Sequence, residues 1–239
     1  MFLSVIIPAY NEEKRIVRTI EDSHEYLKTQ NYEYEIIVVN DGSNDGTSKI
    51  VGDLSRAYPR VRLINLENNK GKGFAVKEGM RLSRGQFKLF MDADNSTTIA
   101  NVDRFLPYLQ KDIYDIVISS RQRPDSRILV EQPKARRFLG GVWRLVVKMI
   151  VPLALSDSQN GFKLFRREAA NFLFSKQTIE RWAFDVEILA LARKFNFNIK
   201  EVGVEWKNDS DSRLSLVGMV HMLSELIQIR TNLWKKRYD

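Results

Sequence analysis

The chain has 239 residues, enough for one large domain or two small ones, and 44% of them are hydrophobic, which supports a substantial core. It has no cysteine and only two histidines, so disulfides, thiolate catalysis and zinc–sulfur sites are excluded, and histidine-based machinery is disfavoured. A formal net charge of +8 favours anionic partners: phosphates, nucleic acid or an acidic membrane face.

The first half of the chain alternates between strand and helix patterns. Apolar strands are predicted near 5–7, 34–39, 61–64 and 87–91, and helices near 12–28, 46–57 and 73–84. This order predicts an α/β fold whose sheet is mainly parallel and covered by helices on both faces.

The second half is less regular. We expect a strand at 115–119, a mobile arginine-rich loop at 121–137, a helix at 184–195, a strand over most of 197–206 and an amphipathic helix at 214–236. The chain begins in a strand without the features of a signal peptide, and no run of eighteen apolar residues occurs. We therefore expect a cytoplasmic protein, peripheral to a membrane at most.

Two carboxylates, Asp92 and Asp94, directly follow the predicted strand at 87–91. At the carboxyl end of a parallel strand both can face the crevice where α/β sheets hold ligands. There they suit Mg²⁺ or Mn²⁺, with a diphosphate completing the coordination. Taken alone, such a triplet is more often a turn or a helix cap.

Polar segments also follow the first two strands, at 8–12 and 40–43. The ring of Tyr10 and a carboxylate there have the chemistry to stack on a base and to accept its ring N–H. Each segment taken singly is equally consistent with turns and helix caps. Several consecutive strand ends with compatible groups favour a nucleotide site.

The segment 69–73 (Asn-Lys-Gly-Lys-Gly) opens the third helix. Glycines allow close backbone approach, and a helix N-terminus beside Lys70 and Lys72 attracts phosphate. A dinucleotide-binding fingerprint would have a third glycine where Val76 stands, so a Rossmann dehydrogenase is rejected.

With these motifs the chain resembles the inverting family 2 glycosyltransferases of the GT-A fold. Within that family it is similar to the dolichyl-phosphate hexosyltransferases, above all the β-glucosyltransferases. The resemblance covers nearly the whole chain and rests on 8–13, 40–43, 69–73, 92–94, 119–121, 157–165 and 181–187. It implies a single GT-A domain over 1–239, with a nucleotide-sugar half at 1–95, an acceptor half at 96–213 and a C-terminal amphipathic helix at 214–239.

The resemblance also implies roles for individual residues. The residues expected to hold the nucleotide sugar are Pro8, Tyr10, Glu12, Asp41, Lys72, Asp92 and Asp94, with Asp92 and Asp94 binding the metal. The residues expected in catalysis are Asp94, Arg121 and Asp185. Ser96 stands where related mannosyltransferases usually have a glutamine, which leaves a third metal ligand unassigned.

The two possible kinds of acceptor, a sugar hydroxyl and a lipid phosphate, require different groups of the protein. A sugar hydroxyl acceptor needs a general base, whereas a lipid monophosphate, with a second pKa of about 6, is largely dianionic at neutral pH and needs cations to position it. The cations considered are Arg121, Lys163, Arg137, Arg213, Arg136 and Arg123, of which Arg123 is better explained as part of a solvated loop. For Asp185 we favour orientation of the sugar or of an arginine over a base role, with a helix cap as the alternative.

The favoured function is metal-dependent transfer of a hexose, glucose from UDP-glucose above others, to a polyprenyl or dolichyl phosphate. The alternatives are GDP-mannose as donor, a sugar hydroxyl as acceptor, or a nucleotide-sugar sensor without activity. Nucleic-acid binding is discounted because no groove-reading motif accompanies the basic charge. The basic, apolar segments at 142–151 and 214–236 are core helices or interfacial elements at the cytoplasmic face of a membrane.

Overall fold

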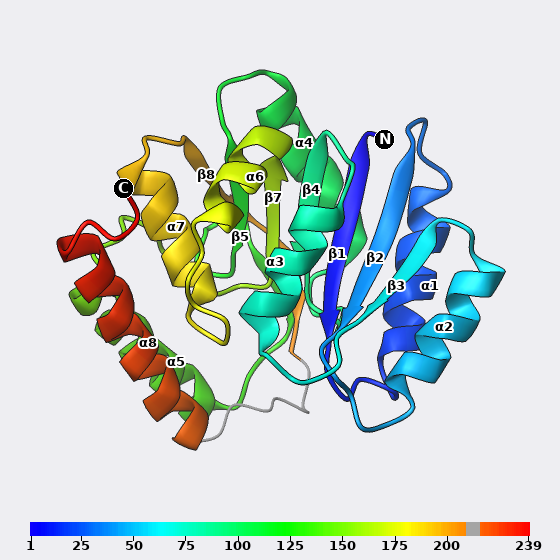
Figure 1. Ribbon diagram of the computed structural model, residues 1–239. Coiled ribbons are helices and arrows are strands. Elements are labelled where there is room, and N and C mark those ends of the chain that lie inside the picture. The colour runs from blue at the N-terminus through cyan, green and yellow to red at the C-terminus, as the bar shows by residue number, and fades with distance from the viewer. Residues whose placement is uncertain (209–215) are drawn as a thin grey trace.

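The computed structural model describes residues 1–208 and 216–239. A seven-stranded sheet of order β3-β2-β1-β4-β7-β5-β8 runs through the molecule (Figure 1). The strands are β1 (Leu3–Ala9), β2 (Tyr34–Asn40), β3 (Val61–Asn65), β4 (Phe87–Met91), β5 (Ile116–Ser120), β7 (Phe162–Arg166) and β8 (Ile199–Gly203). Neighbouring strands are parallel, except that β7 is antiparallel to both β4 and β5. The predicted α/β fold with a mainly parallel sheet is confirmed.

Helices cover both faces of this sheet. They are α1 (Ile16–Leu27), α2 (Thr47–Ala57), α3 (Lys72–Leu82), α4 (Val102–Gln110), α5 (Lys134–Ile150), α6 (Arg167–Ser175), α7 (Phe184–Lys194) and α8 (Leu216–Trp234), with a short 3₁₀ turn at Ile99–Asn101. Buried residues of α1, α2 and α4 form the core on one face, and those of α3, α6 and α7 form it on the other. Alternation along each strand sends successive side chains into these two cores.

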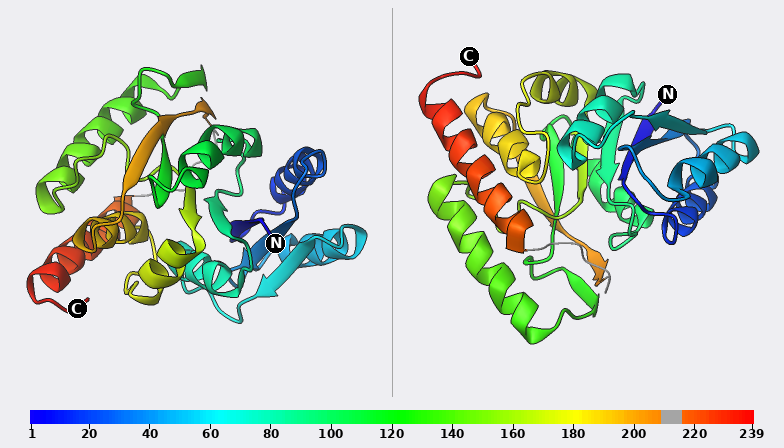
Figure 2. Two further views of the ribbon diagram at one scale, coloured as in Figure 1. Left: turned by 90° about the horizontal axis from the view of Figure 1, so that it is seen from above. Right: turned by 60° about the horizontal axis from the view of Figure 1, so that its bottom comes forward.

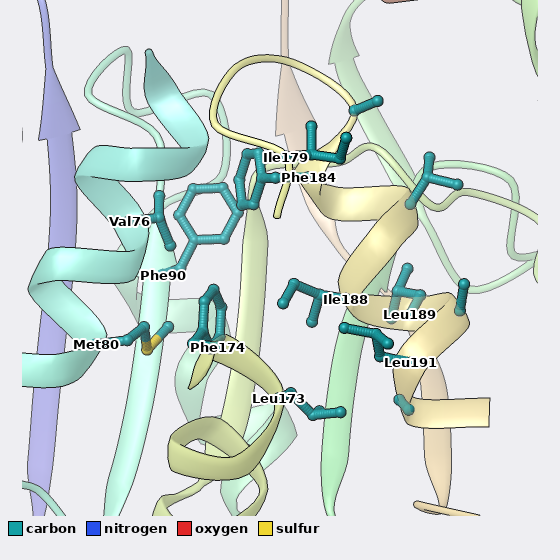
Figure 3. Packing of buried hydrophobic residues seen from close by; sticks show 14 of the residues in the cluster. Val76, Met80, Phe90, Leu173, Phe174, Ile179, Phe184, Ile188, Leu189 and Leu191 are labelled. Carbon is teal, nitrogen blue, oxygen red and sulfur yellow. The ribbon is translucent and has the colours of Figure 1, made fainter. Parts of the chain in front are cut away.

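The core under α3, α6 and α7 is packed around aromatic rings (Figure 3). Phe90 of β4 and Phe184 of α7 have ring centroids 5.6 Å apart, and both side chains are essentially buried. Val76 of α3 and Ile179 belong to the same cluster. The start of α7 is thereby anchored to the middle of the sheet.

The antiparallel strand β7 brings a distant segment to the edge where the parallel strands end. Met91, the last residue of β4, pairs with Phe162, the first residue of β7. The segment 157–161 therefore lies beside 92–94, although about 65 residues of chain separate them. The carboxyl ends of parallel strands, on which the sequence prediction rests, do not predict that 157–161 lies beside 92–94.

Two expectations for the second half were wrong. The arginine-rich segment 121–137 is not a mobile loop, because it contains β6 (Arg127–Val130) and the first turn of α5. β6 pairs in parallel with β9 (Glu205–Lys207). This pairing provides hydrogen-bond partners for backbone N–H and C=O groups of a segment that we expected, from its polar composition, to be a loop. The strand expected over 197–206 is divided between β8 and β9, which belong to different sheets.

Within the described parts of the chain, no helix combines the length and the apolar character needed to cross a bilayer.

Candidate active site

Asp92 is held at the end of β4 by the backbone that precedes β7. Its N–H donates to the carbonyl oxygen of Gly161 at 3.0 Å. A Cβ atom on residue 161 would lie 2.0 Å from Oδ2 of Asp92, far inside contact distance. Glycine at 161 is thus required for the Asp92 side chain to occupy its position.

Asp94 lies two residues further on, and Oδ1 of its carboxylate accepts a hydrogen bond of 2.9 Å from the N–H of Ser96. Burial raises the pKa of Asp94, and the neighbouring charge of Asp92 raises it further. Ser96, whose identity left the third metal ligand open, therefore orients the second carboxylate through its backbone.

Lys72, the first residue of α3, places its ammonium 2.7 Å from Oδ1 of Asp92. Burial opposes its charged form, but Asp92, Asp185 and Asp94 together raise its pKa, so the group stays charged. Its Nζ atom also lies 5.2 Å from the centre of the Phe90 ring. The lysine predicted for the donor phosphates is therefore beside the predicted metal ligands.

The glycines around Lys72 serve a purpose that the sequence did not suggest. The N–H groups of Gly73 and Phe74 donate to the carbonyl oxygens of Arg181 and Glu180 at 3.0 and 2.8 Å. A Cβ atom at Gly71, which has φ +111°, would lie 2.6 Å from the Glu180 carbonyl oxygen. The close backbone approach at these glycines is made by the chain's own segment 180–181. We expected the N–H groups at the start of α3 to face a phosphate, but those of Gly73 and Phe74 are bonded to this segment instead.

Arg121 follows β5 and forms a two-pronged ion pair with Asp157. Its Nε and Nη2 atoms lie 2.7 and 2.9 Å from the two carboxylate oxygens, and its backbone N–H donates to Oδ2 at 3.0 Å. Although burial opposes it, the Arg121 charge holds the pKa of Asp157 below its ordinary value. The Arg121 side chain is 24% exposed and its guanidinium lies over the Trp206 ring, so the side chain is held in place yet remains partly accessible.

Lys163 and Asp185 form a buried ion pair whose charges act together with those of the residues above. We call this set the cluster; its members are Lys72, Asp92, Asp94, Arg121, Lys163 and Asp185. Nζ of Lys163 lies 2.5 Å from Oδ1 of Asp185 and also donates to the Asn160 carbonyl oxygen at 2.7 Å. The two side chains are only 1% and 5% exposed. Burial raises the pKa of Asp185, with Lys163 and Lys72 opposing that rise. Lys163 is therefore placed to hold Asp185 rather than to meet a ligand directly.

The residues predicted for the nucleoside lie at the ends of β1 and β2. Pro8 is buried opposite Val39, and the following Tyr10 is 36% exposed. Asp41 accepts from the N–H groups of Lys70 and Gly71, both at 2.8 Å.

The loops that carry these residues are tied together. The N–H of Asn11 donates to Oγ of Ser43, and the N–H of Glu12 donates to Oγ1 of Thr47. The Glu12 carboxylate pairs with Arg15 at 2.7 Å.

The remaining predicted cations are less closely linked to the cluster. Arg137 lies on α5 and pairs with Glu131 at 3.0 Å, with both side chains exposed. Arg123 is half-exposed and pairs with Asp125 at 3.9 Å, and Arg136 is on the first turn of α5. Arg213 lies outside the described residues.

Carboxylate oxygens of Asp92 and Asp94 are hard donors of the kind that Mg²⁺ and Mn²⁺ prefer, so the pair fits the predicted cation. Among residues 1–208 and 216–239 no group of three or more His, Cys, Asp or Glu side chains is arranged to hold a metal by itself.

Three further residues belong to the cluster and were missed as functional positions: Asp157, Gly161 and Phe90. Asp157 and Gly161 fall inside the motif at 157–165, but the sequence gives no sign that one fixes Arg121 and the other accommodates Asp92. Phe90 reads as an ordinary core residue. Its ring lies within 5.2 and 5.5 Å of the Lys72 and Lys163 ammonium groups.

The sequence pattern of glycosyl transferase family 2 matches residues 4–174 of the chain. The chain belongs to this family. It is a glycosyltransferase, and the predicted resemblance is confirmed.

Solved structures of similar architecture agree with the family 2 assignment. Mannosyl-3-phosphoglycerate synthase from Rubrobacter xylanophilus has a TM-score of 0.73 at 16% identity, and the match covers 99% of this chain and 75% of the synthase chain. Glucosyl-3-phosphoglycerate synthase from Mycobacterium tuberculosis, crystallised with Mn²⁺, UDP-glucose and phosphoglyceric acid, has a TM-score of 0.69 at 18% identity, covering 97% and 79%. These two structures establish the GT-A fold of this family 2 glycosyltransferase.

The relatives of this family 2 glycosyltransferase are closer in sequence. A dolichyl-phosphate β-glucosyltransferase of Trichomonas vaginalis is 36% identical over 250 residues, covering 99% of this chain and 76% of the relative. The enzyme of that name from Dictyostelium discoideum is 37% identical over 251 residues, covering 98% and 77%. The human one is 36% identical over 228 residues, covering 89% and 69%.

Proposed function

We propose that this glycosyltransferase moves glucose from UDP-glucose to dolichyl phosphate or a similar polyprenyl phosphate, with Mg²⁺ or Mn²⁺ bound. The named activity of its relatives supports the acceptor and the sugar. The observation that carries the proposal is the composition of the cluster. It combines two adjacent carboxylates for a cation with two partly exposed positive side chains, Lys72 and Arg121, for phosphates.

Asp92 and Asp94 would hold the cation, which when bound neutralises the charge of the departing diphosphate. Lys72, next to Asp92, is placed to add positive charge to the same phosphates. Asp41, Tyr10, Glu12 and Pro8 keep their predicted role around the nucleoside.

Arg121 is the group that would hold the acceptor phosphate, because its rigid pairing with Asp157 leaves a quarter of the side chain accessible. An oxygen of the acceptor phosphate forms the new bond to C1 of the sugar on the face opposite the nucleotide. The bond from C1 to the donor phosphate breaks, and its electron pair leaves with UDP. A dianionic acceptor loses no proton in this step, so no base is required.

Asp185 fits this scheme as an orienting group. Its carboxylate is buried and occupied by Lys163, and its charge acts on Lys72. We assign Lys163 the task of holding Asp185 in place. Arg137 and Arg213 keep their predicted role as further cations for the acceptor.

A polyprenyl chain is insoluble in water, so the enzyme must meet a bilayer, and α5 and α8 offer the surface. The two helices lie side by side along one edge of the molecule (Figure 2). Apolar residues spaced three or four apart are exposed on α5: Phe138, Val142, Leu145 and Met149. α8 exposes Val220, Leu223, Ile227 and Trp234. We call these eight residues the apolar stripe.

Basic side chains flank the apolar stripe, and this combination favours an anionic bilayer as its partner. On α5 these are Lys134, Arg137, Arg144 and Lys148, and near the end of α8 they are Arg230, Lys235 and Lys236. Helices with an apolar face and basic flanks lie in the plane of anionic membranes. We propose peripheral binding in this orientation, and the cytoplasmic face remains our prediction.

Membrane binding is tested by flotation with vesicles of phosphatidylcholine and phosphatidylglycerol. Exchanging Leu145 and Met149 for serine should remove most of the bound protein, since each contributes roughly 1.5–3 kcal/mol of burial. Ile113, which is 58% exposed and lies between α4 and β5, provides the control. Ile113→Ser should float like the parent, and equal flotation of all three proteins would reject the stripe.

The transfer itself is tested with labelled UDP-glucose and labelled GDP-mannose, polyprenyl phosphate and each metal. We expect label in the organic phase from UDP-glucose, dependent on the metal and lost in Asp94→Ala. Label from GDP-mannose alone would assign the mannose donor instead. Donor binding without any lipid-linked product would favour a sensor.

A further inference from the structure

The segment 180–183 is clamped between α3 and α8. On one side its carbonyl oxygens at Glu180 and Arg181 accept from the first N–H groups of α3. On the other side the N–H groups of Trp182 and Ala183 donate to Oε2 of Glu225, a residue of α8, at 3.1 and 2.9 Å. The carbonyl groups of this short segment are thus bonded to α3 and its N–H groups to α8, so the segment connects the two helices.

The fit on the α3 side leaves no spare room. A Cβ atom on Gly73 would lie 2.7 Å from Cβ of Phe184 and 2.8 Å from the Ile179 carbonyl oxygen. Ile179 and Phe184, which flank the segment, both point into the aromatic core near Phe90 (Figure 3). A shift of the segment must therefore move α3 or be resisted by this packing.

The clamped segment stands between two groups of the active site. Lys72 begins α3, immediately before the clamped Gly73, and Asp185 follows two residues after Ala183. Each of the two carries a charge that acts on the other. The position of Glu225 therefore affects the positions of both Lys72 and Asp185.

Glu225 lies on the inner side of α8, whereas the residues of α8 that belong to the apolar stripe lie on its exposed side. Met222, Leu226 and Ile229 are buried on the inner face, whereas Val220, Leu223 and Ile227 are exposed. Burial raises the pKa of Glu225, against the effect of the backbone N–H groups that it accepts. One helix thus has an exposed side that carries part of the apolar stripe and an inner side bonded to segment 180–183.

We propose that Glu225 is a positioning residue that couples the seating of α8 on an anionic bilayer to the placement of Lys72 and Asp185. This inference rests on the proposed function and on the apolar stripe. In this scheme the bilayer supplies more than the acceptor. By fixing α8 it narrows the positions that segment 180–183 can take, so that the enzyme on a membrane turns over faster than the enzyme in solution.

The test separates this effect from delivery of the substrate. The full chain is assayed with UDP-glucose and a short, water-soluble prenyl phosphate, with and without vesicles of phosphatidylcholine and phosphatidylglycerol that contain no acceptor. For the parent we expect vesicles to raise kcat by at least about fivefold, the lower end of typical coupling between sites. An unchanged kcat in the parent would overturn the proposal.

Glu225→Ala removes the acceptor of both N–H bonds. We expect it to float with vesicles like the parent but to lose the stimulation, with kcat lowered and the KM for UDP-glucose little changed. Glu225→Gln retains an acceptor oxygen and should keep part of the stimulation. Gln228→Ala, an exposed change on the same helix, should behave as the parent does. Full stimulation of Glu225→Ala would contradict the coupling.

A second measurement does not depend on any variant or on turnover. Hydrogen exchange of the amides of Gly73, Phe74, Trp182 and Ala183 should slow when vesicles bind the parent. Unchanged exchange at these amides, with the protein shown to be bound, would reject the coupling. Absence of product with every acceptor while exchange still slows would instead count against the proposed function alone.

Discussion

At the scale of single residues, the active site depends on a glycine that has no chemistry of its own. Gly161 leaves room for the Asp92 carboxylate, and any Cβ atom at 161 would overlap it. Gly161→Ala should therefore displace Asp92 by about 1 Å and lower kcat/KM about 100-fold. The assay is lipid-linked label from UDP-glucose, with folding followed by circular dichroism.

Gly140 offers the matching control for this change. It lies on α5, and a Cβ atom there would come no closer than 3.7 Å to its nearest neighbour, an Arg144 nitrogen. Gly140→Ala should retain activity and gain about 0.5–1 kcal/mol of stability, as expected for alanine in a helix. Comparable losses of activity in both variants would show that the loss in Gly161→Ala does not come from displacement of Asp92.

Arg121 tests the acceptor side at the same scale. Arg121→Lys keeps the charge but cannot reproduce the two-pronged contact with Asp157. We expect the KM for the prenyl phosphate to rise about tenfold, equivalent to about 1.4 kcal/mol, with the KM for UDP-glucose unchanged. A rise in the KM for UDP-glucose alone would move Arg121 to the donor.

At the scale of elements, α7 is fixed at its start by the C-terminal residues. Tyr238 donates from its hydroxyl to Oε1 of Glu187 at 2.6 Å, and Glu187 also accepts from the N–H groups of Thr178 and Ile179. Tyr238→Phe should reduce the free energy of unfolding by about 1–2 kcal/mol, because it removes a bond to a fully buried carboxylate. Urea unfolding measures this, and no change in the midpoint would show that the bond is energetically neutral.

The elements of the first half could be predicted from the sequence because their patterns are local. Alternating apolar strands and helices between 3 and 91 gave the sheet and the strand ends that hold Asp41, Asp92 and Asp94. In the second half the decisive contacts are distant. β7 enters the sheet antiparallel between β4 and β5, and β6 is stabilised by β9 some 75 residues later.

The same distinction applies within the site. The charged residues were predictable by type, and the structure brings Lys72, Asp92, Asp94, Arg121, Lys163 and Asp185 into one electrostatically linked cluster. Their pairings were not predictable. Lys163 is buried against Asp185, and the helix N-terminus expected to face phosphate is bonded to segment 180–181. Such pairings depend on side-chain orientation, which sequence spacing alone leaves open.

At the scale of the whole molecule, one buried charge should make stability depend on pH. Lys88 is 1% exposed, and burial, with Arg167 nearby, lowers its pKa to about 8 from 10.5. Between these values the unfolded chain binds more protons than the folded chain, so stability rises with pH across that window. Below about pH 8 the cost of burying the charge is fully present.

Lys88→Met isolates this contribution. The free energy of unfolding of the parent, relative to this variant, should increase by about 1 kcal/mol between roughly pH 7.5 and pH 9. Urea unfolding of both proteins at the two pH values measures the difference. A constant difference would mean that Lys88 keeps an ordinary pKa through its bonds to the Met80 carbonyl oxygen and to Asn171.

In the proposed reaction a phosphate, which brings its own negative charge, is the nucleophile at the Asp92–Asp94 edge of the sheet. The most direct measurement compares dolichyl phosphate with dolichol as acceptor for labelled UDP-glucose, with mass spectrometry of the lipid product. We predict glucosyl phosphate dolichol in the β configuration from the first and no product from the second. Equal transfer to the hydroxyl of dolichol would contradict a phosphate nucleophile, since a hydroxyl acceptor requires a general base.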